Sequence, residues 1–476
     1  MFYGDRESDT ICAVSTPHGV GGISVIRLSG SQSLSCIRKI CEFIPSTAES
    51  HRVYFGTLKN ISNRDPIDEV LITFFEEGRS FTGEEVVEIS CHGSPIICYN
   101  IMQELLLCGA RSADRGEFTY RSFMNGKMDL VQAESILSLI ESQSKHAAKL
   151  AIRQLKGSVS KVLEKIEDDM VWVLAHAEAG IDFSTEGIVV AENSLVLEKL
   201  SEIEDALSEL VSSFKFGRVL KEGVRVVFAG VPNVGKSSLL NLLLEEDKAI
   251  VTEIPGTTRD LISGETSYEG FQFIFSDTAG FRAETADVVE QIGILKGRKA
   301  VEEADFVCFI FDSSKVISAE EVSLIKLLDP KKTLLVGNKK DLVGSSYRNE
   351  EITLNALKDH FFEDEFNNLE LLKSKLLYVC ANEPSDRKII FEKLLGEVVD
   401  LKNEDSVLIS NVRHFENLRS ALDNTRRSRE VVVSGLGDEF LALEFKEALI
   451  SVQETLGKKF DDQIMDRVFK EFCIGK

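Results

Sequence analysis

Residues 1–125 carry short runs in which apolar and polar positions alternate, separated by glycine turns. The stretches VVEIS and GISVIRLSG place apolar residues at nearly every second position, which predicts strands with one buried face. The stretch PIICYNIMQELLLCGA predicts a helix that ends at Gly109. This mixture predicts an α+β domain over residues 1–125.

The period of the apolar positions then changes from two to between three and four. Leu130, Ala133 and Leu137 follow one another at helical spacing, and the same spacing continues for many turns. Helical spacing returns near the end of the chain, in stretches such as DEFLALEFKEALISVQETLG. We therefore expect one helical domain made of two separated parts, residues 126–217 and 403–476.

Between these two parts, apolar strands alternate with helical segments. The strand candidates are GVRVVFAG, FQFIFSD, ADFVCFIFD, KKTLLVGN and SKLLYVCA. This alternation is typical of a parallel sheet with crossover helices. Domain termini often lie close together, which makes insertion of one domain into another feasible. The predicted fold class is therefore a multidomain α/β protein, with an α/β domain over residues 218–402 inserted in a discontinuous α-helical domain.

Composition limits the classes of partner. The formal net charge is −23, so the protein as a whole repels nucleic acid and anionic membranes. A polyanion must bind through a local basic patch, and Arg426, Arg427 and Arg429 form the clearest basic cluster.

The first ten residues are polar and charged, unlike a signal peptide, and no run approaches the roughly 20 apolar residues of a membrane span. Nine scattered cysteines without a C-x-x-C pair argue against a disulfide framework and a tetrathiolate zinc site. A reducing cytoplasm fits best, with no membrane partner.

The stretch GVPNVGKSS, residues 230–238, matches the phosphate-binding pattern G-x-x-x-x-G-K-S. It follows a predicted strand and opens a predicted helix, which is the context that this motif requires. Backbone N–H groups and the helix N-terminus then cradle phosphates. We expect Lys236 to reach the β- and γ-phosphates and Ser237 to bind Mg²⁺.

Three further motifs point to GTP. DTAG, residues 277–280, follows a strand and places Asp277 near the metal. NKKD, residues 338–341, suits guanine, because Asp341 can accept from the N1–H and the exocyclic amine. CAN, residues 380–382, ends the last strand, where its backbone can meet the guanine O6; many GTPases have S-A-K there, and the lysine that packs on the guanine is absent. PGTTRD, residues 255–260, lies where a switch loop would bring Thr258 to Mg²⁺.

The residues predicted to bind GTP come from these motifs and their flanks. They are Asn233, Val234, Gly235, Lys236, Ser237, Ser238, Thr252, Glu253, Ile254, Pro255, Gly256, Thr257, Thr258, Asp277, Thr278, Ala279, Gly280, Asn338, Lys339, Asp341, Cys380, Ala381 and Asn382.

Two positions bear on the mechanism of hydrolysis. Phe281 follows DTAG where Ras-like enzymes carry a glutamine that orients the attacking water, so another group must orient it. Asn233 lies in the phosphate loop, and its amide oxygen can bind a monovalent cation beside the phosphates. Such a cation would supply the positive charge that an arginine supplies in other GTPases.

Taken together, the chain resembles the MnmE (TrmE) family of tRNA-modification GTPases. The resemblance runs essentially from end to end, through GGISVIRLSG, SFTGEEVVEISCHG, RGEFTYRSFMNGKMDLVQAESI, VVEQIG and the terminal FCIGK. It implies a folate-binding and dimerising N-terminal domain, a discontinuous helical domain and an inserted P-loop GTPase domain. It also implies a homodimer and a heterotetramer with the FAD-dependent partner MnmG (GidA). This complex would modify carbon 5 of the wobble uridine of certain tRNAs.

The resemblance also implies roles for single residues. Asn233, Thr252, Ile254 and Thr257 match the ligands of a K⁺ ion that stimulates hydrolysis, and Glu290 matches the glutamate that orients water. Glu284 is the alternative to Glu290, because this chain has one more residue after DTAG than the family pattern. The positions that match contacts to a 5-formyltetrahydrofolate-type or methylenetetrahydrofolate molecule are Arg27, Glu88, Lys127 and Lys476.

Several alternatives stay open. The terminal CIGK has the outline of a prenylation box, but lysine is not a usual last residue and no polybasic run precedes it. Cys473 is either a participant in the chemistry or a packing residue. Without the resemblance, Arg27 and Glu88 would be read as a surface pair, and the arginine cluster is either a solvated helix face or a tRNA contact. The competing function is a ribosome-assembly GTPase that modifies no base.

Overall fold

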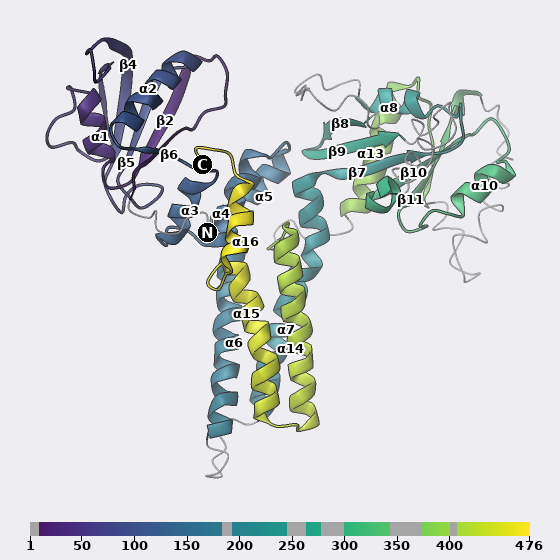
Figure 1. Cartoon of the computed structure of the whole chain (residues 1–476). Helices are drawn as coiled ribbons and strands as arrows, with labels where there is room; N and C mark the ends of the chain where they lie inside the picture. Colours follow the sequence, from purple (N-terminus) through teal and green to yellow (C-terminus); the bar gives the residue numbers. More distant parts are fainter. Residues whose placement is uncertain (1–8, 183–192, 245–262, 278–298, 343–373, 400–406) are drawn as a thin grey trace, which may run out of the picture. The chain divides into compact units, whose positions relative to one another are not determined.

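The computed structural model describes residues 9–182, 193–244, 263–277, 299–342, 374–399 and 407–476 (Figure 1). Its contacts divide the chain into two compact units, and each unit is discontinuous in sequence. Unit 1 contains Met1–Glu141, Ala151–Ser212 and Val412–Lys476. Unit 2 contains Ser142–Leu150 and Ser213–Asn411.

Unit 1 begins with a six-stranded sheet in the order β3-β4-β5-β2-β1-β6, in which only the β1–β6 pair is parallel. The strands are β1 (Ile11–Val14), β2 (Ile23–Ser29), β3 (Arg52–Lys59), β4 (Pro66–Phe75), β5 (Val86–His92) and β6 (Arg111–Ser112). Three helices cover the sheet: α1 (Ser33–Ile40), between β2 and β3, and α2 (Pro95–Leu107), between β5 and β6, lie on one face, and α3 (Glu117–Met124), after β6, lies on the other.

The two faces of this sheet follow from the alternation along β2. Ile26 and Leu28 point into the core that β2 shares with α1 and α2. Arg27 points the other way, because successive side chains of a strand leave opposite faces. On that second face, Phe118 of α3 is buried against Ile11 and Ala13. The face that α3 covers therefore carries Arg27.

The rest of unit 1 is helical. The helices are α4 (Leu130–Ile140), α5 (Lys145–Leu155), α6 (Ser158–Asp182), α7 (Asn193–Glu222), α14 (Val412–Ser434), α15 (Asp438–Leu456) and α16 (Asp462–Lys470), of which α5 and α7 continue into unit 2. Helix α15 packs against α14 and α6, and Figure 1 shows α6, α7, α14 and α15 running side by side. The start of α4 is fixed by a capping box, in which Asp129 and Gln132 satisfy each other's backbone N–H groups.

A buried ion cluster joins the two sequence-distant parts of this helical region. Arg413 donates to both carboxylate oxygens of Glu134, at 2.9 and 3.0 Å, and to the carbonyl of Glu454 at 2.9 Å. His414 also bonds to Glu134. Burial alone would raise the pKa of Glu134, but the charges and hydrogen bonds of His414 and Arg413 lower it to about 2. The cluster fixes α4 to α14.

Unit 2 is built around a second six-stranded sheet, in the order β12-β11-β10-β7-β9-β8. All neighbours are parallel except β8 and β9. Its elements are β7 (Val224–Ala229), α8 (Lys236–Leu244), β8 (Ser263–Tyr268), β9 (Phe271–Asp277), β10 (Phe306–Asp312), α10 (Ala319–Ile325), β11 (Thr333–Asn338), η2 (Lys340–Leu342), β12 (Leu376–Tyr378) and α13 (Pro384–Val399). The five strands predicted for this region are present, and β8 is an additional one.

The predicted fold class is confirmed: an α/β unit lies in the sequence between two stretches of a helical region that follows an α+β sheet. The boundaries at residues 125, 217 and 402 stay predictions. Contacts assign residues 142–150, at the start of α5, to unit 2, where Leu150 joins the core.

Among the described residues, no helix has the length and apolar character needed to cross a membrane. None of the nine cysteines is in a disulfide, and only Cys473 is exposed.

Candidate functional site

The phosphate-binding loop of unit 2 runs from β7 to α8 and depends on backbone shapes that few residues adopt. Gly230 has φ +141°, and a Cβ there would lie 2.2 Å from the carbonyl oxygen of Ile310. Asn233 has φ +65° and Gly235 has φ +97°. The side chain of Lys236 is buried, and its Nζ donates to the carbonyls of Gly230 at 2.8 Å and Val231 at 2.9 Å. The loop thus holds an ammonium group beside a helix N-terminus, which is the arrangement that binds phosphates.

Asn338, at the end of β11, joins three segments of the site. It is 2% exposed, and its Nδ2 donates to the Val234 carbonyl in the phosphate loop at 2.9 Å. Its Oδ1 accepts from the backbone N–H of Lys339 at 2.8 Å and of Ala381 at 3.2 Å. A Cβ at Gly235 would lie 2.2 Å from Asn338 Nδ2, so this close approach requires glycine. One side chain therefore connects the phosphate loop to the two segments predicted to bind guanine.

Lys339 bridges the phosphate loop and the end of β10. It adopts φ +64°, and its Nζ donates to the carbonyl of Asn233 at 3.0 Å and to Asp312 Oδ2 at 2.8 Å. Burial alone would raise the pKa of Asp312, but hydrogen bonds from Lys339 and Ser314 lower it below its ordinary value. Sequence reasoning missed Asp312, although an acid that closes the apolar strand FVCFIFD was a usable signal.

The segment of residues 380–382 is held by a second acid, Asp386 of α13. Asp386 accepts from the backbone N–H of Cys380 at 2.6 Å and from Lys340 Nζ at 2.6 Å. Asp341 is exposed in η2. Burial raises the pKa of the Cys380 thiol, and a hydrogen bond to Asp341 raises it further. Asp341 and Cys380, which sequence reasoning assigned to guanine, therefore lie in contact.

Some of the other residues predicted to bind GTP lie within the described part of the chain, and others lie outside it. Ser237 and Ser238 are exposed in the first turn of α8. The backbone of Asp277 closes β9, paired in register with Phe228 of β7. Outside the described residues lie Thr252, Glu253, Ile254, Pro255, Gly256, Thr257, Thr258, Thr278, Ala279, Gly280 and Glu290.

In unit 1, the predicted folate residues gather around the face of the sheet that α3 covers. Arg27 and Glu88 are register partners on β2 and β5, and Arg27 donates twice to Glu88 Oε1, at 2.9 and 2.7 Å. The Arg27 guanidinium lies 5.6 Å from the ring centre of Phe81 and 5.7 Å from that of Phe118. Its side chain remains 17% exposed. Cation–π contacts and an ion pair thus orient one accessible guanidinium.

The C-terminal tail lies against the first strand of the same sheet. Ser15 Oγ donates to the Gly475 carbonyl at 3.2 Å, and Ile474 forms an antiparallel bridge with Arg115. A Cβ at Gly475, which has φ +90°, would lie 2.5 Å from the Val14 carbonyl oxygen. Because Val14 follows Ala13, the register partner of Arg27, the tail and Arg27 occupy the same end of the sheet.

Lys476 is the residue after this docked glycine and is half-buried. Lys127 lies in the turn after α3, and its Nζ donates to the carbonyl of Gly78, in the loop between β4 and β5, at 2.8 Å. Cys473 is exposed, and its carbonyl accepts weakly from the N–H of Gly116 at 3.5 Å. The tail itself is anchored by Phe472, whose buried ring stacks on Phe469 at 5.5 Å.

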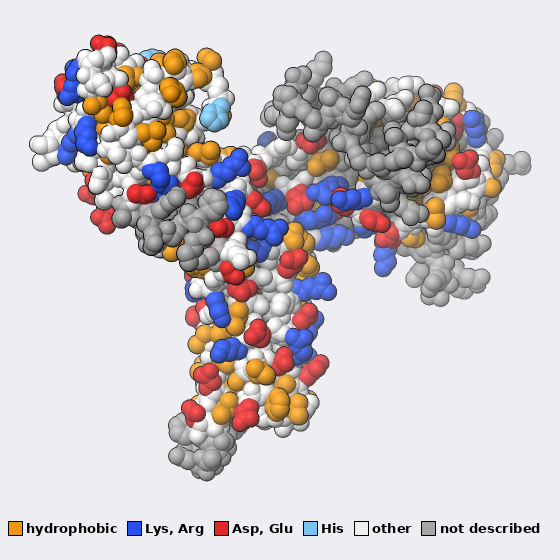
Figure 2. Space-filling view, in the orientation of Figure 1, with side chains coloured by type: hydrophobic (Ala, Val, Ile, Leu, Met, Phe, Trp, Pro, Cys, Tyr) orange, Lys and Arg blue, Asp and Glu red, His pale blue; other side chains and the backbone are white. Residues whose placement is uncertain are grey.

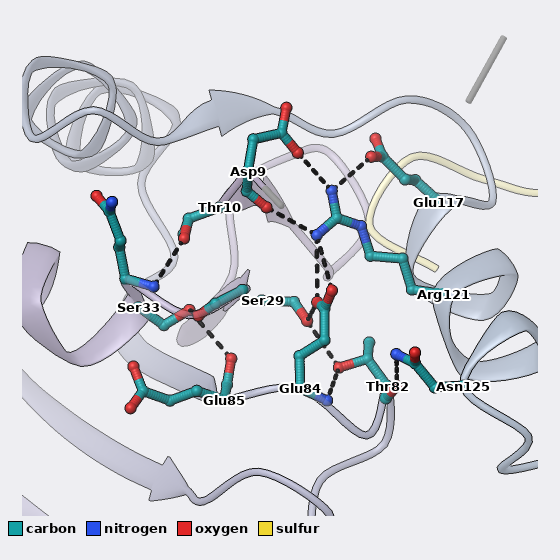
Figure 3. Close-up of polar contacts among 12 residues, drawn as sticks. Asp9, Thr10, Ser29, Ser33, Thr82, Glu84, Glu85, Glu117, Arg121 and Asn125 are labelled. Atoms are coloured by element: carbon teal, nitrogen blue, oxygen red, sulfur yellow. Dashed lines mark hydrogen bonds and ion pairs between the residues drawn. The ribbon is translucent and has the colours of Figure 1, made fainter. Parts of the chain in front are cut away.

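Sequence reasoning missed a charged network beside this region. Figure 3 shows Arg121 of α3 between the acids Asp9, Glu84 and Glu117. Burial alone would raise the pKa of Glu117, but hydrogen bonds from Arg111 and from the Asp114 N–H, with the charge of Arg121, lower it. The four-residue spacing of Glu117 and Arg121 was the available signal, since such pairs face each other on a helix.

The basic cluster of α14 is paired with acids. Arg426 and Arg429 both contact Glu204, at 3.0 and 3.1 Å, and Arg427 contacts Glu444 at 3.1 Å. Figure 2 shows acidic and basic side chains interspersed over the visible face of the helices. The solvated-face interpretation of this cluster is therefore favoured over a tRNA contact.

Comparison with known proteins covers both units. Residues 10–127 match the model of the GTP-binding protein TrmE N-terminus, and residues 130–473 match that of the MnmE helical domain. The tRNA modification GTPase MnmE of Bdellovibrio bacteriovorus is 60% identical over 476 residues, covering 100% of this chain and 99% of that protein. The protein of the same name from Flavobacterium johnsoniae is 37% identical, covering 98% of this chain and 99% of that protein.

Among solved structures, the chain is similar to the G domain of the T. maritima FeoB iron transporter. This match is 23% identical and covers 37% of this chain and 98% of that chain. Its TM-score of 0.24 is too low to support a conclusion. The two family models and the full-length relatives are sufficient by themselves: the chain belongs to the MnmE (TrmE) family of tRNA modification GTPases.

Proposed function

We propose that this chain is a potassium-stimulated GTPase that takes part in modifying carbon 5 of the wobble uridine of certain tRNAs. The observation that carries the proposal is the phosphate loop with its buried Lys236, joined by Asn338 to the guanine-side segments, in a chain of the MnmE family. Ser237 and Thr258 would hold Mg²⁺, which neutralises charge on the phosphates when bound. Glu290 would orient the attacking water.

Potassium would be bound by Asn233, Thr252, Ile254 and Thr257. Asn233 is exposed at the turn of the phosphate loop, and its backbone carbonyl is already engaged by Lys339. Its side-chain amide is therefore the group that remains for a cation beside the phosphates. A bound monovalent cation supplies positive charge where the phosphate charge develops.

The potassium proposal has a direct test in rates of GTP hydrolysis measured in KCl and in NaCl. We expect faster hydrolysis in K⁺, and loss of the difference in Asn233→Ala. Because Asn233 has φ +65°, alanine adds backbone strain, so Asn233→Gly is the matched variant that removes the amide without that strain. Equal rates in the two salts for the native chain, or an intact difference in Asn233→Gly, would reject the assignment.

The modification itself would use a folate-derived carbon and the FAD-dependent partner MnmG (GidA), in a heterotetramer built on a homodimer of this chain. Arg27, Lys127 and Lys476 suit the carboxylates of a folate, since guanidinium and ammonium groups form charge-assisted bonds with carboxylates. Phe81 and Phe118 add apolar surface beside Arg27. A bound methylenetetrahydrofolate would supply the one-carbon unit.

The cysteines of this chain form no disulfide, which suits the reducing cytoplasm in which we place the protein.

The reaction is tested by mass spectrometry of tRNA nucleosides from a strain that lacks this chain. We expect wobble uridines without the carbon-5 group, and restoration by the native gene. Cys473→Ser is the informative variant, with GTP hydrolysis as its control. Full modification by Cys473→Ser would leave that residue a structural role, and unchanged uridines in the deletion strain would instead favour a ribosome-assembly GTPase.

A further inference from the structure

The loop between β4 and β5 is held by side chains of α3, of the turn after α3 and of β2. Ser122 Oγ donates to the Phe81 carbonyl at 2.7 Å, and Asn125 Nδ2 donates to the Thr82 carbonyl at 2.8 Å. Lys127 Nζ donates to the Gly78 carbonyl at 2.8 Å. We call residues 78–84 the clamp loop. Three of its backbone carbonyls are thus fixed by α3 and the turn that follows it.

Arg121 is the charged centre of this contact. The residue is 6% exposed, and Figure 3 shows its guanidinium directed at the clamp loop and at the start of β1. Nη1 donates to Glu84, at 3.1 and 3.2 Å, and to the Asp9 carbonyl at 2.8 Å. Nη2 donates to Asp9 Oδ1 at 2.7 Å and to Glu117 at 3.0 Å. One buried cation therefore joins three segments that are distant in sequence.

The contact extends from the clamp loop to β2. Ser29 Oγ donates to Glu84 Oε2 at 2.6 Å and shares a hydrogen bond of 2.7 Å with Thr82 Oγ1. Ser29 lies two residues after Arg27, so the two side chains leave the same face of the strand. The clamp loop also carries Phe81, whose ring lies over the Arg27 guanidinium. Moving the loop would therefore change both the ring over Arg27 and the polar contacts beside it.

Removing the cation would take from Glu84 the positively charged partner that the structure describes for it, whereas Asp9 and Glu117 would keep Arg111. The side chain of Glu84 is 18% exposed, and a mostly buried carboxylate is costly to leave without its charge-assisted bonds. Glu84 lies on the clamp loop, so the loop is the segment whose position depends on this contact.

We propose that Arg121 is a positioning residue for the folate site: through Glu84 it sets the clamp loop, and with it the Phe81 ring, against Arg27. This inference rests on the proposed function, since it concerns the folate that Arg27 would bind. Arg121 acts through Glu84 and Phe81 and needs no contact with the ligand.

The competing explanation is that Arg121 only anchors α3 to the sheet. Arg111 provides the matched control, because it binds two of these three acids, Asp9 and Glu117, from β6. It donates to Asp9 Oδ2 at 2.7 Å and to Glu117 at 2.6 and 3.0 Å. Among its contacts within the described residues, none goes to Glu84 or to any other residue of the clamp loop. If folate binding depends on the whole network, replacing either arginine will weaken it. If it depends on the position of the clamp loop, only replacing Arg121 will weaken it.

The experiment is calorimetric titration of 5-formyltetrahydrofolate into the full-length chain. We compare the native chain with Arg121→Gln, Glu84→Gln and Arg111→Gln, and with the double variant of the first two. We expect Arg121→Gln and Glu84→Gln each to weaken binding roughly tenfold, as for loss of one charged hydrogen bond. The double variant should be no weaker than either single variant, because both remove one interaction. Arg111→Gln should stay within about twofold of the native chain.

The outcomes separate the inference from the proposed function. A native chain that does not bind the folate would overturn the folate part of the proposed function and the inference with it. Binding by the native chain, with equal losses in Arg121→Gln and Arg111→Gln or no loss in either, would overturn the inference alone. GTP hydrolysis and thermal unfolding check that each variant folds, and if Arg121→Gln does not, the result with Glu84→Gln decides.

Discussion

Unit 2 and unit 1 assemble their polar contacts over different distances along the chain. In unit 2, Lys236 binds a carbonyl six residues away, and Asn338 reaches the phosphate loop across 104 residues. In unit 1, Arg413 meets Glu134 across 279 residues. Ser15 meets Gly475 across 460 residues.

The difference follows from the two sheets. In the parallel sheet of unit 2, the carboxyl ends of β7, β10 and β11 lie at one edge, so residues just after each strand come together. In the antiparallel sheet of unit 1, contacts form across strands and with α3 and the tail, and no strand end collects them. A site at the carboxyl ends of parallel strands can be recognised from short sequence motifs. A site built across strands can be recognised only when the pairing of the strands is known.

The largest effect should come from the longest-range buried ion cluster. We expect Glu134→Gln to lower the free energy of unfolding of unit 1 by about 3–5 kcal/mol at pH 7, because Arg413 and His414 lose their buried partner. Urea unfolding, followed by a probe in the helical region, measures it. Arg426→Ala removes a half-exposed pair with Glu204 and should cost less than about 1 kcal/mol.

The difference in stability between the native chain and Glu134→Gln should depend on pH. The folded-state pKa of Glu134, about 2, lies below the ordinary value of 4.5, so its stabilisation is complete above that ordinary value and is lost as the pH falls toward 2. The stability gap between the native chain and Glu134→Gln should therefore shrink below pH 4.5. A gap that stays constant down to pH 2.5 would show that the carboxylate charge does not stabilise α4 against α14.

The next effect belongs to unit 2. Lys236→Ala should lower the rate of GTP hydrolysis by about 10²- to 10³-fold, because the ammonium beside the phosphates is lost. Folate affinity, measured on the same preparation, should not change, since the two sets of residues lie in different units. If Lys236→Ala weakens folate binding as well as GTP hydrolysis, the two units do not act independently.

The smallest effect should come from the tail. Gly475→Ala places a methyl group 2.5 Å from the Val14 carbonyl oxygen in a backbone conformation that costs about 1–3 kcal/mol for other residues. We expect faster amide hydrogen exchange over residues 473–476. The control is Gly435→Ala, where φ is also positive at +65° but nothing lies within 4 Å of the new methyl group. Equal exchange in the tail of both variants would mean that the contact with Val14 does not hold it.

How far the sequence could predict the structure follows from the same contrast. The phosphate loop, the strands before it and the order of domain types were predictable, because each depends on local spacing. The contact of Asn338 with Val234 follows from parallel-strand geometry once the motifs are recognised. The Arg121 network was not predictable, since Asp9, Glu84 and Arg121 belong to three segments whose pairing no local pattern specifies. The residues proposed to bind folate were predicted only through the family resemblance, and their role stays a prediction.

The distance between Glu134 and Arg413 also has a consequence for synthesis of the protein. A ribosome adds roughly 5–20 residues per second, so Arg413 is made roughly 15–55 s after Glu134. During that interval the nascent chain carries α4 with its acid exposed and without the arginine that will neutralise it. The whole of unit 2 is translated within the same interval, because residues 142–150 and 213–411 lie between Glu134 and Arg413 in the sequence. The ion cluster that fixes α4 to α14 can therefore form only after the ribosome has synthesised unit 2.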